Sequence, residues 1–337
     1  MKGLVVSILS LMFVFASVAQ PDINGGPLNT RPETGIIDGV YMQTHVPTKK
    51  LVPYEFVREA DVIWSKRVWR TLDLREKINH PIYYPFDYED ADGNWVKHSS
   101  RWSLWTIIRT HVMSGDLTVY SPYNPLLYTV RDGDEFKYPL LPTPGRNYYN
   151  DKNFRDTIYP YLGQLGESSD IPLVNQYGED STIITNEETG DFEYVYPPVD
   201  TNWFYSEDIE QYRLKEDWFL DKERSVLDVR IIGIAPVIFK KDISTGNIIG
   251  KEELFWLYFP ECRYVFNNYF VYNEQNDARW MSFDDFFWKR RFSSTIDKKS
   301  NVFDRDIEKY RVGVDALMES KKITEEIRLI EHDVWSF

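Results

Sequence analysis

The chain of 337 residues contains a single cysteine, Cys262, so no disulfide can form within it. A fold of this length has to be held together by its hydrophobic core instead, and the chain is long enough to bury one or two cores. Cys262 lies in the apolar sequence 259–266, which predicts a buried and inert thiol. For an exported protein, the lack of disulfides is more typical of a bacterial periplasm than of small extracellular scaffolds.

Positive charge is missing from a long central stretch. Residues 156–212 contain no lysine, arginine or histidine but 13 aspartates and glutamates, which account for almost all of the formal net charge of −14. An acidic chain is a poor ligand for nucleic acid and for anionic lipid, because both carry negative charge themselves. Proline, glycine and aromatic residues recur from about 138 to 203, which predicts a long acidic loop region with short hairpins, packed on the body of the protein.

Long hydrophobic runs are missing as well, except at the N-terminus. Residues 4–18 are largely apolar and follow the positive charge of Lys2. This run is too short for a comfortable membrane span, which needs about 20 apolar residues. Small side chains at Ser17 and Ala19 predict a secretory signal peptide over residues 1–19, with an uncleaved anchor as the alternative. No cysteine stands directly after the cleavage site, so we expect an exported protein that is not itself a lipoprotein.

Motifs for catalysis and for metal binding are also lacking. The five histidines are scattered and form no H-E-x-x-H or H-x-x-x-H pair. Residues 166–170 lack the second glycine of a nucleophile elbow. The segment 87–98 superficially suggests a calcium loop, but Tyr88 and Ser99 stand where acidic ligands belong. No glycine-rich phosphate loop is present, and spacing alone does not identify a pair of glycosidase carboxylates. The sequence therefore predicts no enzyme, no cofactor and no metal site.

Two similar motifs are the most informative feature that the chain does contain. W-x-K-R-V-x-x-T-L-D at 64–73 has an ungapped counterpart, W-x-R-R-F-x-x-T-I-D, at 288–297. Both combine aromatic rings with fixed positive charge, and tryptophan and arginine are typical of interface hot spots. We predict partner-interface residues in and beside the two motifs: Trp64, Lys66, Arg67, Arg70, Arg75, Trp288, Arg290 and Arg291. Core packing is the alternative for the tryptophans and a solvated helix face for the cations, and both duplication and chance similarity of two helices stay open.

The separation of charge along the chain suggests how such an interface forms. Basic residues gather in 66–77 and 289–299, whereas 156–212 has none. Complementary patches at different places on one chain make head-to-tail contacts, which close into rings or extend into filaments. We hypothesise that the basic faces receive an acidic surface, either of a partner or of a neighbouring copy.

The hydrophobic pattern favours an α+β fold, because helices come first, strands follow and helices end the chain. We expect helices flanking a small antiparallel sheet, with the long acidic loop region in the middle. The pattern predicts helices over 57–78, 101–113, 283–290 and 305–331 (the last with a break near Lys322), strands over 117–120, 226–239, 253–259 and 265–272, and a tight turn at Asp92-Gly93. Ser99 or Ser100 is the predicted N-cap of the second helix and Gly115 its C-terminal stop, and Ser282 is the predicted N-cap of the third. The predicted division is a signal peptide (1–19), an extended N-terminal arm (20–53), an N-terminal α/β part (54–140), an acidic loop-rich insert (141–223) and a C-terminal α+β part (224–337).

Four segments together resemble one known family. They are IDGVY at 37–41, READVIWSKRVWRTLDLREKIN at 58–79, ELFWLYFPECR at 253–263 and SFDDFFWKRRF at 282–292. With the signal peptide, they are similar to the gliding-motility family GldN, called PorN in non-gliding members of the Bacteroidetes. The resemblance covers essentially the whole mature chain, with the acidic middle as the part that matches least.

The resemblance implies a non-enzymatic role in the periplasm, as a structural subunit of the type IX secretion and gliding machinery. Members of the family form a ring with a GldK/PorK-like outer-membrane lipoprotein and contact the periplasmic domain of a GldM/PorM-like protein. Such a partner would supply the lipid anchor that this chain lacks. The family offers no catalytic or cofactor residues to carry over. An extracytoplasmic hydrolase and a carbohydrate-binding module remain as alternative functions.

Overall fold

The computed structural model of the protein describes residues 50–91, 93–98, 101–127, 131–165, 183–185, 192–194, 201–241, 248–276 and 281–334. The predicted signal peptide, almost all of the N-terminal arm and much of the acidic loop region lie outside these residues. The described helices are α2 (His80–Tyr83), α3 (Leu104–Ser114), α4 (Lys152–Leu162), α5 (Phe259–Phe266), α6 (Phe283–Trp288) and α7 (Val314–Val334), with 3₁₀ helices η2 (Glu59–Asp61), η3 (Lys77–Asn79), η4 (Gly133–Glu135) and η5 (Ile307–Lys309). None of the helices in this part of the chain is long and apolar enough to cross a membrane.

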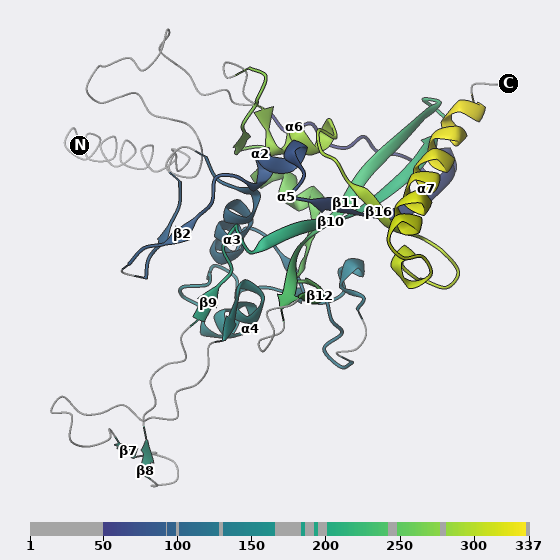
Figure 1. Ribbon diagram of the computed structural model, residues 1–337. Coiled ribbons are helices and arrows are strands. Elements are labelled where there is room, and N and C mark those ends of the chain that lie inside the picture. Colours follow the sequence, from purple (N-terminus) through teal and green to yellow (C-terminus); the bar gives the residue numbers. More distant parts are fainter. Residues whose placement is uncertain are drawn as a thin grey trace, which may run out of the picture.

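An eight-stranded antiparallel sheet forms the centre of the fold (Figure 1). Its strand order is β16-β1-β10-β11-β13-β4-β5, and β12 pairs with β11 beside this path. The strands are β1 (Val62–Asp73), β4 (Val119–Tyr120), β5 (Pro139–Leu140), β10 (Ile209–Asp221), β11 (Val226–Lys241), β12 (Ile248–Glu253), β13 (Trp256–Tyr258) and β16 (Thr295–Lys299). The predicted α+β class is confirmed, but the prediction of a small sheet is wrong.

The described residues also form four two-stranded pairs outside the main sheet. They are β2 (Tyr88–Glu89) with β3 (Trp95–Val96), β6 (Gly163–Leu165) with β9 (Thr201–Trp203), β7 (Ile183–Thr185) with β8 (Phe192–Tyr194), and β14 (Phe270–Val271) with β15 (Met281–Ser282). Two of these pairs fall in the predicted acidic loop region. The end of that region is not a loop, because residues 209–212 open β10, a central strand of the main sheet.

The predicted first helix is instead the strand β1. Residues 62–73 pair with β10 on one side and with β16 on the other. The apolar spacing that suggested a helix, with Trp64, Val68 and Leu72 four residues apart, also places these side chains on one face of a strand, since four is a multiple of the strand period of two. β-branched and aromatic residues fill the segment, and these favour extended backbone.

Other local predictions succeed where a cap or a turn marks the end of an element. Ser282 accepts a hydrogen bond from Asp285 N and caps α6, as predicted. Gly115 ends α3 in the left-handed conformation, also as predicted, although Ser103 caps the start of the helix three or four residues later than expected. Gly93 lies in the turn between β2 and β3, and Asp92 lies outside the described residues.

The structure corrects three predictions for the C-terminal half of the chain. The predicted strand over 253–259 is divided between β12 and β13, and its last residue begins α5. The predicted strand over 265–272 is the end of α5, a turn and the short β14. The final helix is unbroken at Lys322. It begins at Val314 and not near Arg305, since the preceding residues form the short η5 instead.

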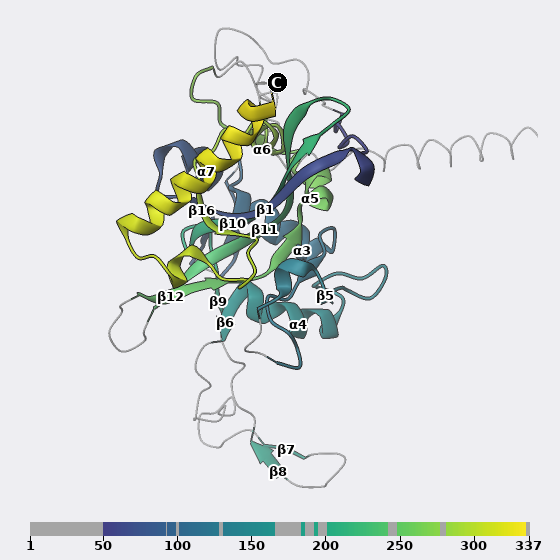
Figure 2. The same ribbon diagram turned by 90° about the vertical axis from the view of Figure 1, so that its right-hand side faces the viewer.

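Two cores and a cluster of three residues (Trp69, Ala235 and Trp256) pack on the sheet in the described part of the chain. The larger core packs side chains of β1, β10 and β11 against α3, α5 and α6, and it includes Leu72, Leu214, Ile234, Trp105, Phe266 and Phe287. Cys262 is buried in this core and burial raises the pKa of its thiol, which agrees with the predicted inert cysteine. In the smaller core, Ile323 and Ile327 of α7 pack on Val68 and Ile296, so α7 lies along the β16 side of the sheet (Figure 2).

Candidate functional site

The two sequence motifs lie side by side in the sheet. β1 and β16 run antiparallel with Thr71 opposite Thr295, and the Thr71 hydroxyl donates a hydrogen bond to the carboxylate of Asp297. The first motif is a strand throughout, whereas the second begins in α6 and reaches β16 after a turn in which Arg290 has a φ of 49°. Matching positions of the two motifs therefore differ in secondary structure. The two similar sequences do not form two copies of one structural unit in the described chain.

Arg70 of the first motif and Arg290 of the second bind the same carboxylate. Glu216 on β10 is fully buried and lies 3.1 Å from Arg70 Nε and 2.8 Å from Arg290 Nη1. Trp218 donates its indole N–H to Glu216 at 3.0 Å, and its ring lies against both guanidinium groups. Burial lowers the pKa of Arg70, although Glu216 opposes this shift. Both arginines are thus committed to an internal cluster that joins β1, β10 and the turn after α6.

The exposed arginines of the first motif also have partners within the chain. Arg67 donates two hydrogen bonds to Asp217, at 2.6 and 2.7 Å. Arg75 binds Asp73, two residues before it, at 2.5 Å. Exposed pairs of this kind contribute little to stability and exchange readily for other partners. A role of Arg67 and Arg75 at an interface remains a prediction.

The remaining predicted interface residues differ in exposure. Trp64 and Lys66 are half-buried, and Trp64 packs on the smaller core beneath α7. Arg291 is exposed, and 49% of the Trp288 surface is accessible. Of the two tryptophans, only Trp288 therefore presents a large part of its ring to the surface of the described chain.

Trp288 holds the end of the N-terminal arm, a contact that sequence reasoning missed. Tyr54 stacks on Trp288 with ring centroids 5.3 Å apart, and the Arg263 guanidinium lies 4.3 Å from the centre of the Tyr54 ring. Arg263 is buried, binds Asp284 through two hydrogen bonds and donates to the carbonyl of Val52 at 2.7 Å. Burial raises the pKa of Tyr54 to about 12. The arm is therefore anchored on the C-terminal part by an aromatic and cationic socket.

We expect Tyr54→Ala to lower the free energy of unfolding by about 1–2 kcal/mol, because the ring loses its stacking partner and its cation–π contact. Urea unfolding followed by tryptophan fluorescence measures the change. Phe56→Ala is the matched control, since Phe56 lies in the same segment but is 89% exposed. Equal effects of the two substitutions would show that the socket does not hold the arm.

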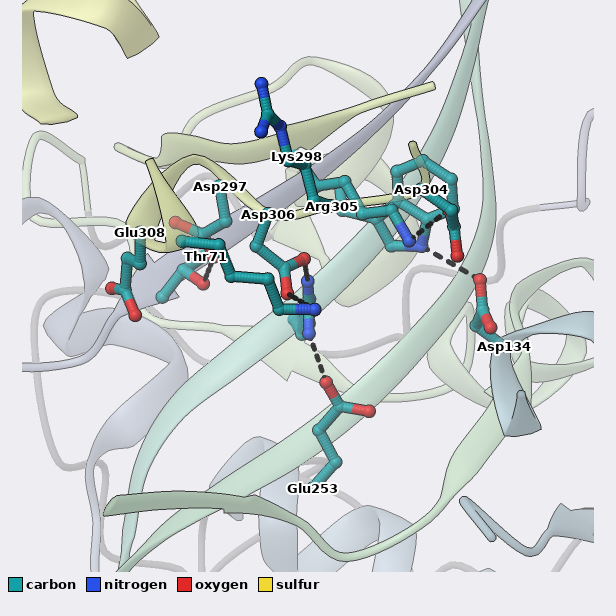
Figure 3. Close-up of polar contacts among 12 residues, drawn as sticks. Thr71, Asp134, Glu253, Asp297, Lys298, Asp304, Arg305, Asp306 and Glu308 are labelled. Carbon is teal, nitrogen blue, oxygen red and sulfur yellow. Dashed lines mark hydrogen bonds and ion pairs between the residues drawn. The ribbon is translucent and has the colours of Figure 1, made fainter. Parts of the chain in front are cut away.

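A charged groove covers the other face of the sheet. Its two adjoining parts have volumes of about 530 and 350 Å³ and share Arg131, Arg213, Glu253, Asp306 and Lys309. Figure 3 shows carboxylates from separate elements directed into it, including Glu253 of β12 and Asp306 before η5. Both bind Arg213 of β10, Asp306 at 2.9 Å. Although burial alone would lower it, these two carboxylates raise the pKa of Arg213.

The charges that line this groove hold protein segments together. Lys298 of β16 binds Asp304 at 2.6 Å, and Lys215 of β10 binds Asp134 at 3.2 Å. Through these pairs and that of Arg213 with Asp306, the segments around η4 and η5 are fixed to the sheet. In the ranges that the structure describes, no group of three or more histidine, cysteine, aspartate or glutamate side chains is arranged to hold a metal ion. The ion pairs of the groove therefore fix the segments around η4 and η5 to the strands β10 and β16.

Asp297, which lines the charged groove, makes the stability of the folded protein depend on pH. Burial raises the pKa of Asp297, although Thr71 and Arg213 oppose the shift. The folded protein therefore holds this proton more tightly than the unfolded chain, whose aspartates titrate near about 3.9. The stabilising contribution of Asp297 is present below that value and is lost as the pH rises through the higher pKa of the folded state.

We expect Asp297→Asn to be at least as stable as the parent protein at neutral pH, because asparagine accepts the Thr71 hydrogen bond without a buried charge. The substitution should also remove the fall in stability that begins above about pH 4, where the unfolded chain loses the Asp297 proton before the folded protein does. Urea unfolding across this pH range measures both effects, with Asp304→Asn, at an exposed side chain, as the control. A clear loss of stability at neutral pH would contradict the burial argument.

The family assignment follows from a direct comparison of the chain with known families. The model of the family described as "Gliding motility associated protein GldN" matches residues 57–336. The chain belongs to the GldN family. No curated protein matches it significantly. The expectation drawn from the four similar segments is thereby confirmed.

Membership of the GldN family makes the chain a component of the gliding-motility and type IX secretion machinery. The GldN family is one of structural components and is not a known enzyme family. The match begins at Val57, so it includes both motifs, the whole of the main sheet and α7. The internal Glu216 cluster, the Trp288 ring and the charged groove are all parts of this GldN-family region.

Proposed function

We propose that this GldN-family chain is a periplasmic structural subunit that assembles into a ring with a GldK/PorK-like outer-membrane lipoprotein and contacts the periplasmic domain of a GldM/PorM-like protein. The family match over residues 57–336 carries the proposal. The N-terminal sequence supports export, since residues 1–19 have the pattern of a secretory signal peptide. The residue directly after the predicted signal is Gln20 and not a cysteine, which supports a partner that supplies the lipid anchor.

The described surface also supports assembly. Several large apolar side chains are highly exposed, among them Phe56, Leu126, Val302 and Phe303. Val302 and Phe303 are neighbours in the chain, and exposed apolar side chains that lie together in one patch mark interaction sites in soluble proteins. By contrast, the acids and bases of the charged groove pair mainly with one another, and the exposed Trp288 ring is already stacked on Tyr54. Neither arrangement favours the alternative functions of a hydrolase or a carbohydrate-binding module.

A pull-down of the tagged mature chain from the periplasm, followed by size-exclusion chromatography at low and high salt, tests the proposal. We expect a very large complex that contains an outer-membrane lipoprotein. Loss of this complex at high salt would identify charged contacts within it, because salt screens exposed pairs. Recovery of a monomer without any partner at low salt would contradict the proposal.

A further inference from the structure

The end of the N-terminal arm is a separable part of the fold. No backbone hydrogen bond joins residues 50–57 to the backbone of another residue that the structure describes, and none of these eight residues belongs to a helix or a strand. The carbonyl of Val52 accepts its hydrogen bond from the side chain of Arg263, and the carbonyl of Glu55 accepts one from the side chain of Arg230. The arm can therefore leave the body of the protein without breaking any strand pairing or helix.

The socket that receives the arm is held by other parts of the body. Asp284 of α6 binds Arg263 of α5 through two hydrogen bonds, at 2.7 and 3.1 Å. Arg263 also lies 4.8 Å from the centre of the Trp288 ring, and Arg230 lies 5.1 Å from the centre of the Phe219 ring on β10. If the arm left, the Trp288 ring and the Arg263 cation, now 2% exposed, would face water. The empty socket would therefore favour binding of another segment of the same sequence.

The residues between the socket and β1 are suited to act as a hinge. Phe56 is 89% exposed, whereas the residues that follow it are fixed to the body. Arg58 binds Asp61 at 2.6 Å, and the carbonyl of Asp61 accepts a hydrogen bond from Lys222 N at 2.8 Å. A rotation about the backbone of Phe56 and Val57 would therefore redirect the arm and leave β1 in place.

Exposed apolar side chains lie at the end of the sheet where this hinge begins. Ile63 at the start of β1 is 63% exposed and Val226 at the start of β11 is 47% exposed, in addition to Phe56. The strand register places them close together, since Val62 pairs with Asp221 and Asp221 pairs with Val226. These strand ends lie away from α4 in both views of the molecule (Figures 1 and 2). Such a surface suits a contact with a second copy, at the point where an exchanged arm would cross over.

We propose that, in the assembled protein, the arm of each copy occupies the socket of a neighbouring copy. An arm in its own socket and an exchanged arm make the same socket contacts, so exchange costs little beyond the change at the hinge and the association of the chains. Partners that hold many copies together raise the effective concentration of arms and sockets, which favours exchange. The inference rests on the proposed function, in that it names a contact between copies. An arm passed from each copy to the next makes a head-to-tail contact, which closes into a ring when the rotation between copies permits.

Exchange would give Trp288 the interface role that its motif predicts. Its ring would stack on Tyr54 of the neighbouring copy, as it stacks on Tyr54 of its own chain at 5.3 Å. The carboxylate of Glu55 would likewise bind Arg224 of the neighbouring copy, which it binds at 2.5 Å within one chain. Glu55 and Arg224 therefore report which chain holds the arm.

A shortened hinge tests the exchange on the purified chain. Deletion of Phe56 and Val57 leaves the arm about 7 Å too short for its own socket, since each residue spans at most about 3.6 Å. The socket of a second copy remains accessible. We expect the deletion variant to elute from size-exclusion chromatography as a larger species than the parent chain, and the further substitution Tyr54→Ala to remove this shift. A deletion variant that elutes like the parent chain would overturn the proposal, as would a shift that survives Tyr54→Ala.

A variant with a hinge of unchanged length is the matched control. Phe56→Ser with Val57→Ser removes the same two side chains but leaves the arm long enough for its own socket. It should elute like the parent chain. If it elutes like the deletion variant instead, the loss of the side chains and not the length of the hinge causes self-association, and the exchange is refuted.

Cysteine pairs identify the chain that holds the arm in the assembled complex. Glu55→Cys in one tagged copy is co-expressed with Arg224→Cys in a differently tagged copy, and the recovered complex is treated with a short thiol crosslinker. We expect a product that carries both tags. The matched control is Arg58→Cys with Glu223→Cys, because these side chains lie 3.9 Å apart on the body side of the hinge and stay within one chain. Cys262 is buried and does not compete for the crosslinker.

The outcomes separate this inference from the proposed function. If a complex with the lipoprotein is recovered but Glu55→Cys and Arg224→Cys crosslink only when both are in one chain, the exchange is wrong and the proposed function stands. A control pair that also gives a product with both tags would count against exchange, since the crosslinks would then report only crowding of the copies. If the shortened hinge gives Tyr54-dependent oligomers but the parent chain recovers no lipoprotein, the exchange stands and the proposed function is contradicted.

Discussion

Glu216→Ala should lower the free energy of unfolding by about 3–5 kcal/mol, because it leaves the buried cation of Arg70 and the largely enclosed cation of Arg290 without their shared partner. Glu216 is fully buried and the Arg70 side chain is 9% exposed, so water cannot replace the lost carboxylate. The loss is measured as the change in the urea unfolding midpoint and slope. We expect the same substitution to weaken the connection between β1 and the turn after α6.

The neighbouring residue provides a matched control. Asp217 lies next to Glu216 on β10 and binds Arg67 at the surface, so Asp217→Ala should cost less than about 1 kcal/mol. Replacing the whole cluster by apolar residues of similar size, Glu216→Leu with Arg70→Met and Arg290→Met, should restore much of the stability, because no charge then remains buried. Similar costs for Asp217→Ala and Glu216→Ala would refute the argument from burial.

Phe287→Ala should have a second large effect, a loss of about 3–5 kcal/mol, since it opens a cavity between α5, α6 and the sheet. Phe287 is 1% exposed, and its ring lies 5.4 Å from that of Phe259 and 6.0 Å from that of Phe266. The aromatic residues around it come from two helices that cover the same face of the sheet. Thermal or urea unfolding of the purified chain measures the loss.

The conservative substitution at the same position provides the comparison. Phe287→Leu keeps most of the side-chain volume and should cost about 1–1.5 kcal/mol. If leucine and alanine cost the same, the destabilisation would come from the loss of aromatic contacts and not from the cavity. The expected order is parent, leucine variant, alanine variant.

The sequence predicts those parts of the fold that local chemistry decides. Ser282 and Gly115 mark helix ends because their side chain or backbone conformation satisfies a requirement that arises within a few residues. β11 is predicted by its long run of β-branched residues. The segment 57–78 is predicted wrongly because its apolar residues recur every four positions, a spacing that suits both a helix and one face of a strand.

The candidate site depends on contacts between distant segments, which local patterns do not contain. The basic residues of both motifs stand out in the sequence, but the chain does not show that Arg70 and Arg290 meet at Glu216. Likewise, no local signal connects Tyr54 with Arg263. Sequence reasoning therefore finds the residue types that matter in the motifs and misses their partners, because β1, β10 and β16 bring together residues more than 200 positions apart, as Thr71 and Asp297 are.

The place of β1 in the sheet also determines when folding can finish. β1 begins at Val62, but one of the two strands that pair with it, β16, ends only at Lys299. The helix α7, which lies along the β16 side of the sheet, comes later still in the chain. A chain that emerges N-terminus first, from a ribosome or from a translocation channel, holds its first long strand with one side unpaired until nearly the last residue appears. Pairing across such a sequence separation is slow, and the open strand edge invites aggregation meanwhile. Such late completion would suit the export proposed above, because a chain that crosses a membrane through a channel has to stay unfolded until it has crossed.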